Sequence, residues 1–345
     1  MPRFNQTRPV TFILKGIPGL EDLYLWLSLP FSFMFIAILL GNGTILFLLV
    51  TESTLDKPMY HLLAMLLLAD LVSTLSMMPQ VLSLLWFGVQ DVSLEACLLQ
   101  MFFIHSSSVV RSTVLVAMAF DRYVAICDPL RYTTVLSGSL VCRLGLVALS
   151  KGVGLILPFP LLLRQLTFCR TVIAHTYCDH MAVVKMACGH TGPNRIYGLF
   201  VAVLVVGLDC LFIGVSYALI LRAVLRLSSH GARLRALSTC SSQLSVAVIT
   251  YGPALFSAIV HRFGHSIPVH SHVLLANLYL LVPSLFNPII FGVRTKEIRD
   301  MVTKTGLPLY QVLIKSPALL ASLESCKHSL GSCGQGDLSG QCSPE

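Results

Sequence analysis

Charged residues are scarce in this chain, because only 12% of its 345 residues are Asp, Glu, Lys or Arg. An ordinary soluble domain carries about 25% charged residues, so the deficit argues against a water-soluble protein. Apolar residues fill the gap and make up 55% of the sequence. The uncharged runs repeatedly reach the roughly 20 residues that a helix needs to cross a bilayer.

Recognisable catalytic motifs are also lacking. The sequence has no Gly-x-Ser-x-Gly, no phosphate-binding glycine loop and no His-Glu-x-x-His. Its serines and histidines stand at no known triad spacing. The sequence therefore does not support catalysis and implies no cofactor. It also contains no internal repeat and no second soluble domain.

Seven apolar stretches indicate a polytopic membrane protein with helical spans, because a backbone in hydrocarbon must satisfy its hydrogen bonds within each segment. We predict spans at 24–51, 58–86, 97–127, 140–163, 195–227, 235–262 and 270–294. The polar residues 1–23 show no cleavable signal peptide, so the first span is expected to be its own signal anchor. Residues 303–345 lack apolar periodicity and are expected to form a disordered tail.

Two signals place the N-terminus outside the cell. Asn5 begins an Asn-Gln-Thr glycosylation sequence, which is useful only on the extracellular side. With this orientation the basic residues fall at cytoplasmic helix ends, as the positive-inside rule expects: Arg131, Arg143, Arg222, Arg226, Arg233, Arg235, Arg294, Lys296 and Arg299. The net charge of +8 thus reflects topology. Nucleic-acid binding is a poor second interpretation, because the basic residues are spread over several loops.

An ordered set of motifs carries a family resemblance. The third span ends in Met-Ala-Phe-Asp-Arg-Tyr-Val-Ala-Ile-Cys, residues 118–127. The other motifs are Gly41-Asn42, Pro58-Met59-Tyr60, Leu68-Ala69-Asp70, Asp128-Pro-Leu-Arg-Tyr132, Ser238-Thr-Cys240 and Asn287-Pro288. At this spacing, residues 12–302 resemble a rhodopsin-like G-protein-coupled receptor, specifically an olfactory receptor. Finer features resemble the class I branch: Gly16–Glu21, Tyr177–Met181, His261–His265 and Ala276–Tyr279.

The resemblance implies an all-α fold with seven transmembrane helices over residues 24–302, an extracellular N-terminus and a short amphipathic eighth helix. It implies a multi-pass receptor of the plasma membrane, in olfactory cilia, that binds a small, water-soluble odorant resembling a carboxylic acid. It further implies coupling to a stimulatory olfactory G protein, a rise in cyclic AMP, and dependence on trafficking chaperones and membrane lipid. Two alternatives stay open: a metabolite- or pH-sensing receptor of the same fold, and a transporter. The transporter is disfavoured because inverted repeats are missing.

The family also implies roles at the cytoplasmic side. Activation and G-protein coupling would involve Asp121, Arg122, Tyr123, Asn287, Pro288 and Phe291. Taken alone, Arg122 could simply be an arginine that extends its charge to the interface. The family usually has tyrosine where this chain has Phe291, and a histidine where it has Gln243. The missing hydroxyl at Phe291, together with Arg111, puts signalling efficiency in question.

Four outer cysteines, Cys97, Cys169, Cys178 and Cys188, allow three disulfide pairings. The resemblance implies the pairs Cys97–Cys178 and Cys169–Cys188, which would hold the second outer loop over the bundle. These bonds would be structural.

Ionisable residues within spans are costly and therefore suggest function. Asp70 and Arg111 lie at similar depth, roughly 18 and 16 Å from the cytoplasmic helix ends by the helical rise. The family usually carries glutamate at Arg111, so we expect Arg111 to pair with Asp70 in place of a bound cation. Arg111 could instead contact ligand or be a damaging substitution. Lys151 and Asp209 also lie near mid-depth, where they could pair with each other or serve packing alone.

Ligand contacts are expected in the outer half. Arg262 ends the sixth span, where a guanidinium could bind a carboxylate with two hydrogen bonds. A simple interfacial anchor is the alternative. The other predicted ligand-binding residues are His105, Ser108, His180, Met181, Ala258 and Tyr279. His261 and His265 have a spacing that could hold a metal on one helical face, but nothing completes a site, so no metal is expected.

Overall fold

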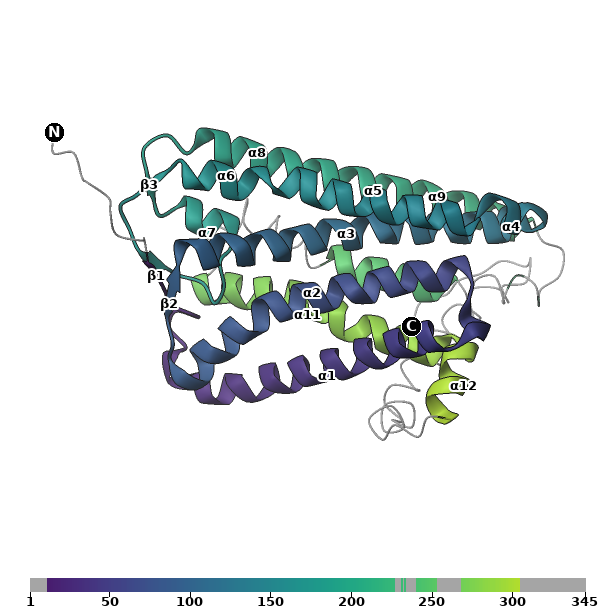
Figure 1. Ribbon diagram of the computed structural model, residues 1–345, viewed down its shortest axis with the longest axis horizontal. Coiled ribbons are helices and arrows are strands. Elements are labelled where there is room, and N and C mark those ends of the chain that lie inside the picture. The colour runs from purple at the N-terminus through teal and green to yellow at the C-terminus, as the bar shows by residue number, and fades with distance from the viewer. Residues whose placement is uncertain (1–10, 227–230, 232, 234–239, 253–267, 305–345) are drawn as a thin grey trace, which may run out of the picture. The chain divides into compact units, whose positions relative to one another are not determined.

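A computed structural model describes residues 11–226, 231, 233, 240–252 and 268–304. Among these residues, six helical stretches are long and apolar enough to cross a membrane: Glu21–Thr51, Pro58–Phe87, Leu94–Cys127, Gly138–Arg164, Gly192–Leu225 and Val269–Val293. Residues 240–252 are also helical and form the described part of the predicted sixth span. The fold is therefore the seven-helix membrane bundle that the sequence predicts (Figure 1).

The spans consist of continuous and interrupted helices. The first three are α1 (Tyr24–Thr51), α2 (Pro58–Phe87) and α3 (Leu94–Cys127). The fourth comprises α5 (Gly138–Ile156) and α6 (Pro158–Arg164), because Pro158 cannot donate the hydrogen bond of a continuous helix. The fifth comprises α8 (Gly192–Ala202), the π-helical segment η4 (Val203–Gly207) and α9 (Leu208–Leu225), and the last span is α11 (Val269–Arg294).

Several helix ends follow from local sequence. Pro58 opens α2, where its missing N–H costs nothing. Gly88 ends the same helix with φ 67°, a left-handed conformation that favours glycine. Ser93 and Ser137 cap α3 and α5 by accepting hydrogen bonds from Ala96 N and Leu140 N.

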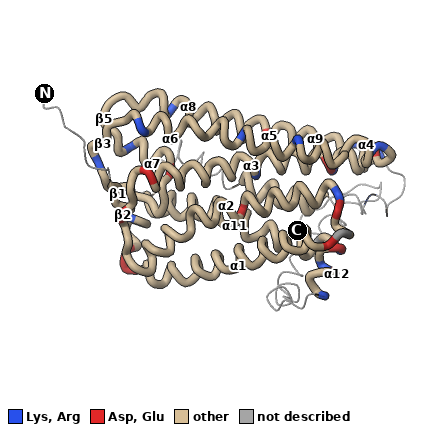
Figure 2. The backbone as a smooth tube through the Cα atoms, in the orientation of Figure 1, with Lys and Arg blue, Asp and Glu red and all other residues tan. Residues whose placement is uncertain are grey.

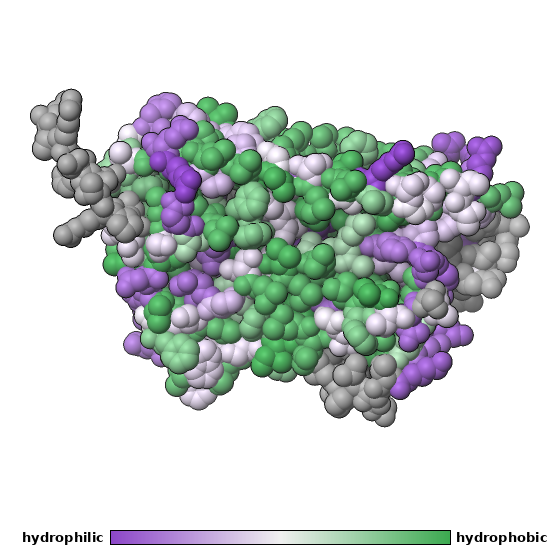
Figure 3. Space-filling view, in the orientation of Figure 1, coloured by the Kyte–Doolittle hydropathy of each residue, from purple (hydrophilic) through white to green (hydrophobic). Residues whose placement is uncertain are grey.

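Helix α3 lies at the centre of the bundle and packs against α2, α5 and α9. Large apolar side chains such as Trp26, Phe33 and Phe47 are exposed on the outer faces, as lipid contact requires. Figure 3 shows apolar surface across the middle of the helices, with hydrophilic residues toward their ends. Charged residues likewise gather near the helix ends, and few lie in the middle (Figure 2).

Short strands cover the extracellular end. Strand β1 (Thr11–Leu14) pairs antiparallel with β2 (Asp91–Ser93) and parallel with β4 (Val172–Ile173). Strand β3 (Thr167–Phe168) pairs with β5 (Ala187–Cys188). Phe12 and Leu14 of β1 are fully buried. Part of the N-terminal segment, which the sequence suggested was simply polar, is thus an ordered strand with an apolar inner face.

The remaining short elements connect the spans. They are η1 (Glu21–Leu23), η2 (Ser53–Leu55), η3 (Pro129–Arg131), α4 (Tyr132–Val135) and α7 (His180–Val184). The described residues 292–304 belong to a second unit, which contains α12 (Lys296–Lys304). Ile298 and Val302 share one face of α12 at a spacing of four, whereas Lys296, Arg299 and Asp300 are charged, so α12 is the predicted amphipathic eighth helix.

Candidate functional site

A cavity of about 850 Å³ lies in the extracellular half of the bundle. Helix α3, the π-helical segment η4 and α7 of the second outer loop all contribute to its walls. Most of the lining is aliphatic or aromatic, including Val109, Ile156, Phe159, Leu199, Val203, Val205 and Val206. A largely apolar cavity with a few convergent polar groups is typical of a small-molecule site.

Each predicted ligand residue that the structure describes lines this cavity: His105, Ser108, His180, Met181 and Tyr279. Arg262 and Ala258 lie outside the described residues. Arg195, which sequence reasoning did not select, also lines the cavity. Arg195 is a basic residue near the outer end of a predicted span, which is the same sequence signal that singled out Arg262.

The roof of the cavity is fastened to the helices. Disulfides join Cys97 to Cys178 and Cys169 to Cys188, the pairing that the family resemblance implies. Beside them, Thr176 Oγ1 and the Asn277 side chain of α11 share hydrogen bonds of 2.8 and 3.0 Å. The second outer loop is therefore held to both α3 and α11.

Asp179 of the second outer loop organises the outer side of the cavity. Its carboxylate caps α7 by accepting hydrogen bonds from Met181 N at 3.0 Å and Ala182 N at 3.2 Å, and lies 3.9 Å from His105 Nε2. Burial opposes ionisation of Asp179, but the neighbouring His175 and His105 outweigh it and lower its pKa. Burial, reinforced by His105, also lowers the pKa of His180 to about 4. His180 is therefore neutral near pH 7.

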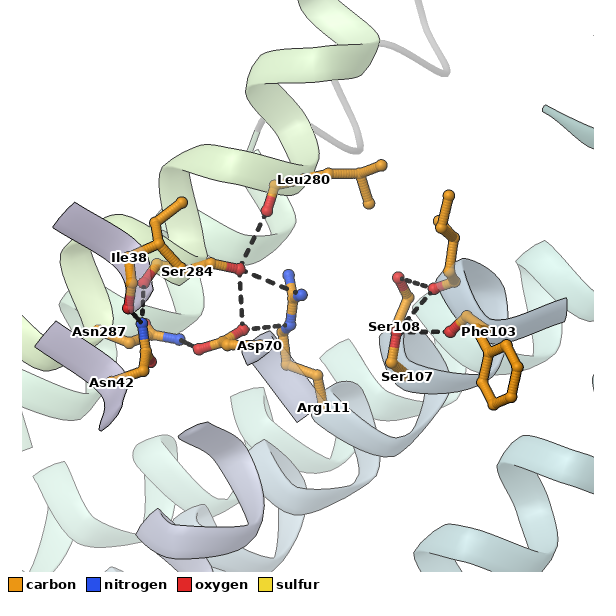
Figure 4. Close-up of polar contacts among 11 residues, drawn as sticks. Ile38, Asn42, Asp70, Phe103, Ser107, Ser108, Arg111, Leu280, Ser284 and Asn287 are labelled. Carbon is orange, nitrogen blue, oxygen red and sulfur yellow. Dashed lines mark hydrogen bonds and ion pairs between the residues drawn. The ribbon is translucent and has the colours of Figure 1, made fainter. Parts of the chain in front are cut away.

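A buried ionic network lies deeper in the bundle (Figure 4). Arg111 Nε is 2.8 Å from Asp70 Oδ1, and the two side chains are only 2% and 0% exposed. Ser284 donates to the same carboxylate at 3.1 Å, and Asn287 donates to Oδ2 at 2.7 Å. Arg111 Nη2 also donates to Ser284 Oγ at 3.4 Å. The structure thus brings together the two charges that the sequence paired.

A second polar network joins four spans beside the cavity. Lys151 Nζ lies 2.9 and 3.1 Å from the two carboxylate oxygens of Asp209. Ser112 donates to Asp209 Oδ2 at 2.6 Å and shares a hydrogen bond with the hydroxyl of Tyr251. Lys151 and Asp209 are not among the cavity-lining residues, but Ser112 and Tyr251 are. No sequence signal singled out Tyr251, because its hydrogen-bond partner Ser112 lies 139 residues away along the chain.

The cytoplasmic end holds the Asp-Arg-Tyr motif. Arg122 Nη2 lies 3.2 Å from Asp121 Oδ2 and also contacts Met59 Sδ. Tyr132 of the following loop donates to Asp121 Oδ1 at 2.9 Å. Burial, followed by the charge of Asp121, raises the pKa of Tyr132. Tyr123 packs against the apolar cluster of Ile220, Val224 and Cys240. The side chains of Arg122 and Tyr123 therefore both contact residues of neighbouring spans.

The last span carries the other predicted activation residues. Asn287 belongs to the Asp70 network, and Pro288 lies close to α1, since a Cβ added to Gly41 would be 3.1 Å from Pro288 Cγ. Phe291 is buried. Both amide atoms of Gln243 are buried without a hydrogen-bond partner in the described part of the chain.

Seven spans, an outer cavity under a disulfide-held loop and an Asp-Arg-Tyr motif at the inner end define a rhodopsin-like G-protein-coupled receptor. Residues 31–307 match the family model described as olfactory receptor. Human olfactory receptor 52P1 is 53% identical over 88% of this chain and 95% of its own length. For human olfactory receptors 52K1 and 52N4 the identities are 50% and 48%, each over 86% of this chain and 95% and 93% of the relative.

The chain belongs to the olfactory receptor family. Its similarity to the group 52 receptors agrees with the class I features of the sequence. It is accordingly a multi-pass receptor of the plasma membrane with an odorant ligand and G-protein coupling, and family membership supports a receptor that is not an enzyme.

Proposed function

We propose that this odorant receptor recognises small carboxylic-acid-like odorants in the outer cavity, activates a stimulatory olfactory G protein and raises cyclic AMP. The observation that carries the proposal is the cavity itself, about 850 Å³ in volume and lined by His105, His180 and Tyr279 together with aliphatic side chains. Its apolar wall suits a short alkyl chain, and its polar outer rim suits the head group.

Two arginines are candidate anchors for the acid. A guanidinium binds a carboxylate through two parallel hydrogen bonds, which fixes orientation as well as charge. We assign this role to Arg262, as in the sequence prediction, with Arg195 of the cavity rim as a second cation. The neutral His180 would contribute hydrogen bonding and not charge.

The inner end supports the coupling part of the proposal. Asp121 contacts both Arg122 and Tyr132. We propose that opening this contact exposes Arg122 and Tyr123 to the G protein. Asn287 links the last span to Asp70. We propose that a movement of α11 on ligand binding is transmitted through Asn287, Pro288 and Phe291 to the cytoplasmic end of the bundle.

We also propose that Arg111 takes the place of a bound cation beside Asp70. Two carboxylates facing each other would need a cation such as sodium between them. Here the guanidinium supplies that charge directly, at 2.8 Å. Signalling by this receptor should therefore be insensitive to sodium at this site.

A cyclic AMP reporter assay tests the proposed ligand class. Cells would carry the receptor, an olfactory G protein and trafficking chaperones, and short and medium carboxylic acids would be applied to wild type, Arg262→Ala and Arg195→Ala. We expect Arg262→Ala to lose the response at equal surface level, because the acid loses its bidentate partner. A response that persists in both variants would contradict the anchor, and one confined to non-acids would contradict the ligand class.

A further inference from the structure

The guanidinium of Arg111 is only partly used by the protein. Arginine carries five N–H donors in a planar fork. The structure gives Arg111 an ion pair through Nε to Asp70 and a single long hydrogen bond through Nη2 to Ser284. Within the described residues no other acceptor reaches the guanidinium. Figure 4 shows the second terminal nitrogen with no contact drawn to it.

Arg111 forms part of the cavity wall. Arg111 is among the lining residues although its side chain is only 2% exposed. It is joined there by Ser108, one helical turn closer to the outside, and by Tyr279 of α11. A guanidinium N–H that faces the cavity without a protein acceptor favours a ligand group that accepts from it.

The charge balance decides which acceptor fits. Asp70 already neutralises Arg111 at direct contact, so the floor of the cavity offers hydrogen-bond donors without net positive charge. A carboxylate buried at this depth would bring an uncompensated charge, which is expensive away from water. A neutral carbonyl oxygen brings none.

We propose that Arg111 forms a floor subsite that binds the neutral carbonyl oxygen of a ketone, ester or lactone group. The inference rests on the proposed function, since it assigns the inner part of the same cavity. His105 and Arg111 are six residues apart on α3, roughly 9 Å by the helical rise. A ligand with an acid group at the rim and a distal carbonyl at the floor would occupy both ends.

Matched probe pairs test the subsite by thermal stabilisation of the purified receptor in detergent. The first pair is a medium-chain carboxylic acid and the same acid with a distal ketone. The second is a methyl ketone and the alkene of equal length, which need no acid anchor. In wild type the carbonyl compound of each pair should bind about tenfold more tightly or better, as expected for a hydrogen bond to a charged group.

Two variants separate the subsite from general damage. Arg111→Lys keeps the charge beside Asp70 but loses the planar fork, so the affinity ratio within each pair should fall toward one. The control Val205→Ala alters the apolar wall of the same cavity and should weaken both members of a pair alike. If Arg111→Lys fails to fold, Asp70→Asn/Arg111→Met removes both charges and every donor at position 111, and should abolish the ratio in the same way.

The outcomes distinguish the two proposals. Equal affinities within both pairs in wild type, a ratio preserved in the Arg111 variants, or no stabilisation by any probe would overturn the floor subsite. Acids that bind without a carbonyl preference would remove the subsite and leave the acid anchor. A carbonyl preference seen only in the neutral pair would keep the subsite and remove the acid anchor.

Discussion

Replacing Asp70 by asparagine should strongly destabilise the receptor. The substitution keeps the size of the side chain but removes the charge that compensates Arg111 at 2.8 Å, and both residues are almost fully buried. Ser284 and Asn287 both donate hydrogen bonds to the same carboxylate, so neither can take over as a counter-charge. Breaking a buried ion pair by removing one partner costs about 3–5 kcal/mol.

The matched control is Glu95→Gln, which also removes a carboxylate from an arginine, in this case Arg164. That pair is 66% and 55% exposed, and exposed ion pairs contribute only about 0–1 kcal/mol. We therefore expect Asp70→Asn, but not Glu95→Gln, to lower the melting temperature of purified receptor and its surface level measured by flow cytometry.

A double-variant cycle sharpens the test. Asp70→Asn/Arg111→Gln should cost less than the sum of the two single changes, because the double variant leaves no isolated charge. Surface delivery, melting temperature and signalling of Asp70→Asn equal to wild type would refute the ionic bridge. Strict additivity in the cycle would refute the direct coupling of the two residues.

Two further predictions concern the extracellular side. Cys97→Ser opens a loop with a sequence separation of 81, whereas Cys188→Ser opens one of 19. Chain entropy predicts that the free energy of unfolding falls by about 4.5 kcal/mol in the first variant and by about 3 kcal/mol in the second. Cys97→Ser should therefore melt at the lower temperature, and the reverse order would contradict this. The depressed pKa of His180 predicts a pH effect. Because the unfolded chain takes up the proton near pH 6.5 and the folded receptor only near 4, stability should fall by up to about 3 kcal/mol as the pH drops through that window. His180→Phe should flatten this part of a melting-temperature profile, and an unchanged slope would exclude His180 as its source.

The sequence predicted the spans well because hydrocarbon demands long apolar helices whatever their partners. Helix α1 begins and ends at the predicted residues 24 and 51, and α2 ends one residue later than predicted. The break at Pro158 and the π-helical segment Val203–Gly207 were not anticipated. Hydropathy indicates which segments lie in lipid. A break or a π-helical turn within a span leaves the hydropathy unchanged, so hydropathy does not reveal either feature.

The site was predictable only in part. Depth along a helix follows from residue counting, so Asp70 and Arg111 could be placed at one level. Rotation about the helix axis does not follow from counting, and the hydrogen bonds of Ser284 and Tyr251 required the structure. Strand β1 was not predicted from the sequence. Its four residues are too few to show a clear alternation of apolar and polar side chains within a long polar segment.

A cryo-electron-microscopy map of the receptor bound to an agonist oxo-acid and its G protein would show directly where the ligand binds. We expect ligand density in the cavity lined by His105, Tyr279 and Arg111, with the carboxylate toward the rim and the carbonyl oxygen within hydrogen-bonding distance of the Arg111 guanidinium. Density outside this cavity, or a metal ion between Asp70 and a displaced Arg111, would contradict it.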